Sequence, residues 1–202
     1  MERQILLLGN LQLYEISEKV NREELEDLRP IFTDMFDTIK GIRRDYGFGR
    51  AIAAPQIGVK KRIICMLKDK PYVIINPELE FVGDEMMEVM DDCMSFPKLL
   101  VRVCRYRHCI LRYLDENWEP QEMRMDDDMA ELIQHEYDHL DGILATMRAI
   151  DSKSFFIVTR SSPCRCLDAS SGSCVDSRRT FDNHFYIIIK SILYCQSGRV
   201  AL

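Results

Sequence analysis

Long apolar stretches are missing from this chain of 202 residues. The most apolar stretch, Phe185–Tyr194, has ten residues with a lysine inside it, which is too short to span a bilayer. Near the start, Ile5–Leu8 provides only four consecutive apolar residues, too few for the core of a signal peptide. We therefore expect a cytoplasmic protein that has no membrane partner.

An excess of positive charge is missing too, because 27 Lys and Arg face 33 Asp and Glu, for a net charge of -6. Overall negative charge repels phosphate, so DNA is not expected as a partner. One strand-like stretch is locally basic, with Arg102, Arg105, Arg107 and Arg112. We interpret it as the solvated face of a hairpin; the alternative is a face toward ribosomal RNA near the exit tunnel.

Disulfides are not expected, although the chain has eight cysteines, because a reducing compartment keeps thiols free. Cys65, Cys104 and Cys109 lie among alternating apolar residues, a pattern typical of buried packing thiols. Cys93 differs because it lies just before a turn marked by Pro97. A nucleophile beside a histidine is one interpretation of Cys93, and a metal ligand is the favoured one.

The composition indicates a globular protein, with 47% hydrophobic and 30% charged residues. After Asp151 the apolar periodicity is lost, and Ser161–Ser177 is rich in serine and cysteine. Cys164 and Cys166 are weak evidence for a metal site, since a lone pair is common by chance. We predict a catalytic domain over residues 1–154 and a divergent, loosely held extension over residues 155–202.

The most informative stretch is Gln134–Leu140, which contains an H-E-x-x-H pattern. With only four histidines in the chain, this pattern is expected in roughly one of two hundred random chains of this composition. On a helix, His135 and His139 share one face and can bind one metal ion. Acidic residues before the motif favour a helix start, and Asp128 with Glu131 fits a capping box.

A third ligand is not found downstream of the motif. No glutamate follows Glu136, and Ala145 stands where one class of zinc peptidases has a histidine. Upstream, Cys93 offers a thiolate, and one thiolate with two imidazoles gives a site with an open fourth position. An open position is typical of catalytic metal sites.

A third segment, Gly49–Gly58, is rich in small residues, which suits a backbone that passes close to a ligand. In this order, Gly49–Gly58, Asp91–Ser95 and Gln134–Leu140 resemble the three motifs of the peptide deformylases. The resemblance covers residues 5–148. It implies an enzyme that removes the formyl group from the N-terminal methionine of nascent polypeptides and releases formate.

The resemblance also implies the roles of individual residues. Cys93, His135 and His139 would bind one divalent metal ion, and Glu136 would act as the general base. The backbone amide of Met94 and the side-chain amide of Gln56 would stabilise charge on the formyl oxygen. Residues Gly49, Arg50, Ala51 and Leu132 would contact the substrate.

Ligand chemistry and family resemblance point to different metals. The usual affinity order favours zinc over ferrous iron at a Cys/His site. The family favours ferrous iron in the cell, with zinc or nickel as alternatives. Asp138, two residues after the base, is a candidate to orient one of the histidines, or a solvated surface charge.

This chain differs from the family pattern at five positions. In the first segment Arg50 replaces an apolar residue and Ala51 a glycine; in the second, Asp91 and Asp92 replace a glutamate and a glycine, and Met94 replaces a leucine. Two other classes of function therefore stay open: a metal-binding homologue without activity, and another metal-dependent amidase or peptidase.

The fold class expected is α+β, with mainly antiparallel sheets packed around the central metal-binding helix. An apolar stripe predicts a first helix that begins near Pro30 and continues to Ile42. Short connections between strand-like runs favour antiparallel pairing. The runs are 63–67, 72–75, 79–82, 99–104 and 109–114.

Overall fold

The computed structural model describes residues 1–158, and residues 1–156 form one compact unit. The predictions for residues 161–177, for Cys164 and Cys166, and for residues 185–194 lie outside the described residues. The proposed division after residue 154 stays a prediction. Within the described residues, neither α-helix is long and apolar enough to cross a membrane.

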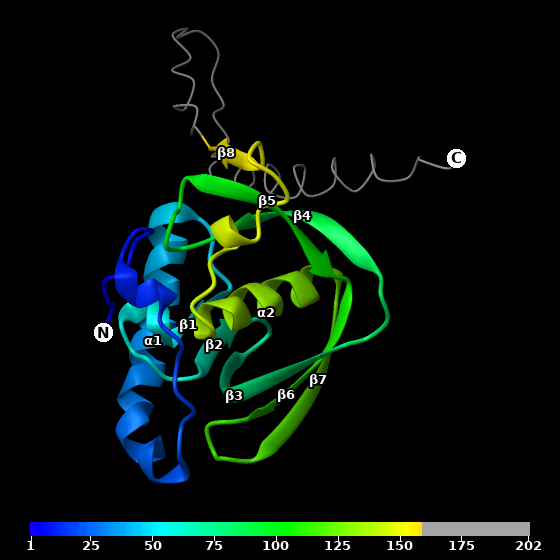
Figure 1. Cartoon of the computed structure of the whole chain (residues 1–202). Coiled ribbons are helices and arrows are strands. Elements are labelled where there is room, and N and C mark those ends of the chain that lie inside the picture. The colour runs from blue at the N-terminus through cyan, green and yellow to red at the C-terminus, as the bar shows by residue number, and fades with distance from the viewer. Residues whose placement is uncertain (159–202) are drawn as a thin grey trace, which may run out of the picture. The chain divides into compact units, whose positions relative to one another are not determined.

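The described part of the chain contains two α-helices and eight strands (Figure 1). The helices are α1 (Leu25–Tyr46) and α2 (Asp127–Leu140), and short 3₁₀ helices occur at Leu11–Tyr14, Arg22–Glu24, Ala54–Ile57 and Ala145–Met147. The strands are β1 (Ala51–Ala53), β2 (Ile63–Leu67), β3 (Pro71–Phe81), β4 (Met86–Asp92), β5 (Leu99–Tyr106), β6 (His108–Leu114), β7 (Pro120–Asp126) and β8 (Phe155–Ile157).

The strands form two sheets, one of five strands in the order β1-β2-β3-β6-β7 and one of three in the order β4-β5-β8. The pairs β1–β2, β2–β3, β3–β6, β6–β7 and β4–β5 are all antiparallel. Helix α2 lies between the strands of the two sheets and contacts both (Figure 1). The predicted α+β class, with a central helix among antiparallel sheets, is confirmed.

Helix α1 begins at Leu25, so the prediction that it starts near Pro30 was wrong. Its start follows a 3₁₀ turn in which the Asn21 N–H donates to the Glu24 carboxylate at 2.8 Å. Pro30 is exposed inside the helix, where its missing N–H leaves one carbonyl at the solvent surface. The apolar stripe is core as predicted, since Phe32, Met35 and other residues of α1 are buried.

Strand β3 joins two runs that the sequence separates at Asn76 and Pro77. Asn76 adopts a left-handed φ of 49°, and the register with β6 shifts between Ile75 and Glu78. The Asn76 side chain stabilises this irregularity by accepting from the Val20 N–H and donating to the Val20 carbonyl, both at 2.9 Å. The prediction of two strands was therefore wrong, because the break is a bulge within one strand.

Four further strands were not predicted: β1 and β8 have only three residues each, and acidic residues interrupt the apolar pattern of β4 and β7. Cysteine burial agrees with the sequence at two of three positions. Cys65 and Cys109 are buried, whereas Cys104 is exposed on β5, so its prediction as a packing thiol was wrong. Burial raises the pKa of the Cys109 thiol to about 11, as expected of a packing residue.

The end of helix α2 is fixed by a close backbone contact. Gly142 follows the last helical residues with φ +69°, and a Cβ at this position would lie 2.5 Å from the carbonyl oxygen of Tyr14. Glycine is thus required both by conformation and by space. This contact closes the C-terminal side of the helix that carries the histidines.

We expect Gly142→Ala to lower the free energy of unfolding by about 3 kcal/mol, from left-handed strain plus a backbone clash. Gly83→Ala is the matched control, since Gly83 has φ +73° and open space around its Cα. It should cost about 1 kcal/mol, from strain alone. Urea unfolding of both variants measures the difference, and equal losses would show that the Tyr14 contact is not a constraint.

Candidate metal centre and active site

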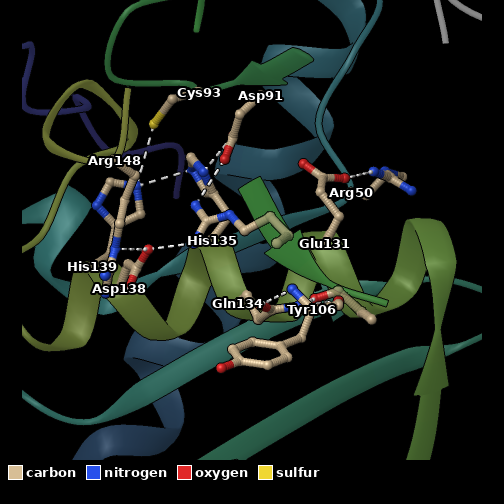
Figure 2. A network of polar contacts seen from close by, with 12 residues as sticks. Arg50, Asp91, Cys93, Tyr106, Glu131, Gln134, His135, Asp138, His139 and Arg148 are labelled. Carbon is tan, nitrogen blue, oxygen red and sulfur yellow. Dashed lines mark hydrogen bonds and ion pairs between the residues drawn. The ribbon is translucent and has the colours of Figure 1, made fainter. Parts of the chain in front are cut away.

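Three side chains from two parts of the chain converge beside helix α2 (Figure 2). His135 and His139 lie four residues apart on the helix, and their Nε2 atoms are 3.2 Å apart. Cys93 directly follows β4, and its Sγ lies 3.2 Å from His139 Nε2. All three residues are buried. The predicted ligands are therefore together in space.

The donor atoms fit a metal ion. They all lie within 4.8 Å of one another, and the usual bond lengths to zinc separate neighbouring tetrahedral ligands by roughly 3.3–3.8 Å. Two groups donate toward the Cys93 sulfur: the Ser95 N–H at 3.4 Å and Gln56 Nε2 at 3.5 Å. These contacts hold the sulfur in place beside the histidines. Burial lowers the pKa of His139, which favours the neutral imidazole that metals need.

We expect the purified protein to bind about one divalent metal ion per chain, and Cys93→Ala to lose it. Elemental analysis after dialysis measures the metal content of each protein. Cys104→Ala is the matched control, because Cys104 is an exposed thiol. Full metal content in Cys93→Ala would contradict the assignment of this sulfur as a ligand.

Asp91 orients the first histidine. Its Oδ1 lies 2.6 Å from His135 Nδ1, on the side of the ring opposite the Nε2 atom that faces His139. Burial by itself would raise the pKa of Asp91, but neighbouring His135 and Arg105 lower it to about 2. The carboxylate is thus charged at neutral pH and holds the His135 ring by a close ion-pair contact. The sequence left Asp138 open between this role and a solvated surface charge; both were wrong, because Asp138 is buried and its partners are Arg105 and Arg148.

Asp138 belongs instead to a buried ion network. Arg105 donates to Asp91 Oδ2 at 2.8 Å and to Asp138 Oδ2 at 2.5 Å. Arg148 donates to Asp138 Oδ1 at 2.8 Å (Figure 2). The Arg105 side chain is only 4% exposed. The signal that could have found this network is Arg105 itself, a charged residue at an inward position of an alternating strand.

The solvated hairpin face predicted for the four arginines was therefore wrong for Arg105. The other three also have acidic partners. Arg102 pairs with Asp151, Arg107 with Glu85 and Asp127, and Arg112 with Glu80 and Glu122.

We expect Asp91→Asn to weaken metal affinity by about 10- to 100-fold, because the charged partner of His135 is lost. Competition with a chromogenic chelator measures the dissociation constant. Glu88→Gln, at an exposed position of the same strand, should leave it unchanged. Equal affinity in Asp91→Asn and the parent protein would show that Asp91 does not tune the ligand.

Glu136 lies beside the histidines and is buried, with 4% of its surface exposed. Burial raises the pKa of its carboxyl group to about 7. Among the described residues, its Oε2 atom has no hydrogen-bond partner. A carboxylate with a pKa near neutrality can accept and then release a proton.

Gln56 and Gly49, both in the small-residue segment Gly49–Gly58, lie against Cys93 and Met94. Gln56 Oε1 accepts from the Ala53 N–H at 2.9 Å, which directs Nε2 toward Cys93 and Ser95. Gly49 has φ +115°, and a Cβ there would lie 2.6 Å from the Cε of Met94. Glycine thus lets the Met94 side chain pack against this segment.

Ala51 and Leu132, two of the predicted substrate contacts, are buried in one core cluster. The third, Arg50, forms ion pairs with Asp128 and Glu131. The predicted capping box of Asp128 with Glu131 was therefore wrong, since both carboxylates face Arg50. The N-cap of α2 is Asp126, which makes no side-chain capping hydrogen bond.

Two other positions have plain structural roles. Asp92 ends strand β4 opposite Leu100 and is not among the described residues with positive φ, so replacing the family's glycine causes no backbone strain. Gln134 anchors α2 to β5 by accepting from the Tyr106 N–H at 3.0 Å and donating to its carbonyl at 2.8 Å.

Comparison with known proteins gives a consistent result. The family model described as polypeptide deformylase matches residues 2–155. A peptide deformylase of Pseudothermotoga lettingae is 36% identical over 78% of this chain and 88% of its own length. A peptide deformylase of Treponema pallidum is 35% identical over 74% of this chain and 89% of its own length.

Solved structures of similar shape carry the same description. A peptide deformylase from Synechococcus elongatus in complex with actinonin has a TM-score of 0.68 at 30% identity, over 74% of this chain and 80% of that one. A peptide deformylase from Thermotoga maritima has a TM-score of 0.68 at 27% identity, over 75% of this chain and 99% of that one.

Proposed function

The chain belongs to the polypeptide deformylase family, and we propose that it hydrolyses the formyl group from the N-terminal methionine of nascent polypeptides, releasing formate. The observation that carries this conclusion is the buried group of Cys93, His135 and His139 with Glu136 beside it. This arrangement has what amide hydrolysis requires: a metal site with an open position and an adjacent carboxylate that can move a proton.

Cys93, His135 and His139 would hold the metal ion, and Asp91 keeps the His135 ring in position. When bound, the ion would supply Lewis-acid chemistry, which makes water more acidic and polarises a carbonyl. The ligands are buried, so bulk water is largely excluded and charges in the site act strongly.

Glu136 takes the proton of the attacking water and later gives it to the departing amine. Its pKa near 7 and the unpartnered Oε2 atom support this role. Because the residue is not itself a ligand, its carboxylate stays available for proton transfer. The water adds to the formyl carbon, the carbon–nitrogen bond breaks, and formate leaves with a free methionine amine.

Gln56 and Met94 stabilise the negative charge that builds on the formyl oxygen. Gln56 is held by the Ala53 N–H with its amide nitrogen directed to Cys93. Met94 directly follows the ligand Cys93 in the chain, which brings its backbone amide to the same place. Gly49, Arg50, Ala51 and Leu132 form the wall against which the substrate lies.

The native metal is ferrous iron in this proposal, with zinc and nickel as substitutes that the same donors accept. The enzyme works in the cytoplasm, on formylated chains as they leave the ribosome. The two other function classes are not favoured, since Asp92 fits the strand and all three ligands are in place.

We expect formate release from formyl-Met-Ala-Ser by protein purified without oxygen and loaded with ferrous iron. Glu136→Gln should lower kcat by about 10²- to 10⁴-fold, because the base is lost while the shape is kept. A coupled formate dehydrogenase assay measures the rate, and metal analysis verifies that the variant is loaded.

Three outcomes separate the candidate functions. Formate from the parent protein and almost none from Glu136→Gln supports the deformylase. Cleavage of an acetylated peptide at a similar rate would instead indicate a general amidase. Stoichiometric metal with no turnover of any peptide would indicate an inactive homologue.

A further inference from the structure

Ser95 is a buried residue close to the candidate metal ligands, with only 1% of its surface exposed. Its N–H donates to the Cys93 sulfur at 3.4 Å, and its hydroxyl oxygen accepts from Gln56 Nε2 at 3.3 Å. Ser95 therefore contacts both a candidate ligand and the amide that is proposed to bind the formyl oxygen.

The orientation of the Gln56 amide follows from its contacts. Oε1 must face the Ala53 N–H, because only the amide oxygen can accept this hydrogen bond. Nε2 then faces Ser95 Oγ at 3.3 Å and Cys93 Sγ at 3.5 Å. An amide nitrogen carries two hydrogens, so the hydroxyl holds one of them and the other points toward the sulfur.

The two hydrogens of Nε2 have different acceptors. Sulfur is a weaker hydrogen-bond acceptor than oxygen. A formyl oxygen at the centre would therefore take over the hydrogen that points toward Cys93, while the Ser95 hydroxyl keeps the other. The hydroxyl would thus hold the amide in one orientation before and after the substrate binds.

The backbones of Gln56 and Ser95 are held independently of these side-chain contacts. The Leu6 N–H donates to the Gln56 carbonyl at 2.8 Å. The Leu8 N–H donates to the Ser95 carbonyl at 2.9 Å. Removal of the Ser95 hydroxyl should therefore leave both backbones in place and release only the Gln56 amide.

We propose that Ser95 is a positioning residue for deformylation, whose hydroxyl holds the Gln56 amide with one N–H directed to the formyl oxygen. This inference rests on the proposed function, because it assigns the formyl oxygen to Gln56. A donor that is oriented in advance stabilises developing charge without being reorganised during the reaction. Ser95 acts only through Gln56.

The first test compares Ser95→Thr with Ser95→Val. The two side chains have nearly the same shape and only threonine keeps the hydroxyl, so their difference separates the oxygen from the added bulk. We expect kcat on formyl-Met-Ala-Ser to be about tenfold lower in Ser95→Val, less than the 10²- to 10³-fold typical of losing a donor itself. KM should agree within about twofold, because the hydrogen bond strengthens only as charge builds on the oxygen.

The second test is a double-mutant cycle. Ser95→Ala should lower kcat about tenfold in the parent protein, but by less than about twofold in Gln56→Leu, where the amide is already gone. A serine that serves only packing would cause the same loss in both backgrounds. Ser17→Ala is the matched control and should leave kcat unchanged, because Ser17 is buried and its hydroxyl has no hydrogen-bond partner among the described residues.

A third measurement follows the Gln56 amide without any turnover. In the zinc-loaded protein the side-chain amide of Gln56 gives NMR signals, which are assigned by their absence from Gln56→Leu. We expect the hydrogens of this amide to exchange with solvent at least about fivefold faster in Ser95→Ala than in the parent, because one hydrogen bond is lost. Ser17→Ala should leave the exchange rate unchanged.

Thermal melts and metal content verify that each variant is folded and loaded. If Ser95→Thr and Ser95→Val do not fold, the cycle and the exchange rates of Ser95→Ala decide the question, since alanine adds no bulk.

Three results would overturn the inference: equal kcat in Ser95→Thr and Ser95→Val, a loss in Ser95→Ala that persists in Gln56→Leu, or unchanged exchange of the Gln56 amide in Ser95→Ala. Each of them leaves formate release by the parent protein intact, so the proposed function would stand. Absence of formate from the parent loaded with ferrous iron would instead refute the proposed function, and the role of Ser95 with it.

Discussion

The site depends on the two ion pairs that the buried Arg105 guanidinium forms. It joins Asp91 at the end of β4 to Asp138 on α2, and all three groups are almost fully buried. A buried ion set persists only when each charge has a partner, because an unpaired charge in the interior costs several kcal/mol. The network therefore fixes the distance between the strand that provides Cys93 and the helix that provides the histidines.

Side chains alternate between the two faces of a β-strand, which explains how one short segment places both Asp91 and Cys93 beside the histidines. Side chains two apart point to the same face, so Asp91 and Cys93 both face α2. Asp91 contacts His135 at Nδ1, and Cys93 lies beside His139 as the third candidate ligand. A one-residue slip of β4 against β5 would turn both away, and the pairing of Asp92 with Leu100 holds that register.

What the sequence revealed followed from local spacing. The approach of His135 to His139 and the central helix were predictable, because a four-residue spacing on a helix fixes relative position. Asp91 was not, because it lies 44 residues before His135 whereas Asp138 lies inside the motif, and only the packing of Arg105 decides which carboxylate reaches the imidazole. Strand β3 was divided wrongly because Asn76 and Pro77 are typical of a turn, whereas contacts with Val20 turn them into a bulge.

Asp91, Glu131 and Glu136 are buried near the centre and differ chiefly in their partners. Asp91 has Arg105 and His135, which hold its pKa at about 2, and Glu131 has Arg50. Glu136 forms no ion pair within the described residues, and burial raises its pKa to about 7. The cations beside Asp91 keep this carboxylate charged as a fixed part of the site. Glu136, which has no arginine ion pair among the described residues, is the carboxyl whose pKa suits proton exchange at neutral pH, so the placement of arginines on this fold favours it as the base in the proposed reaction.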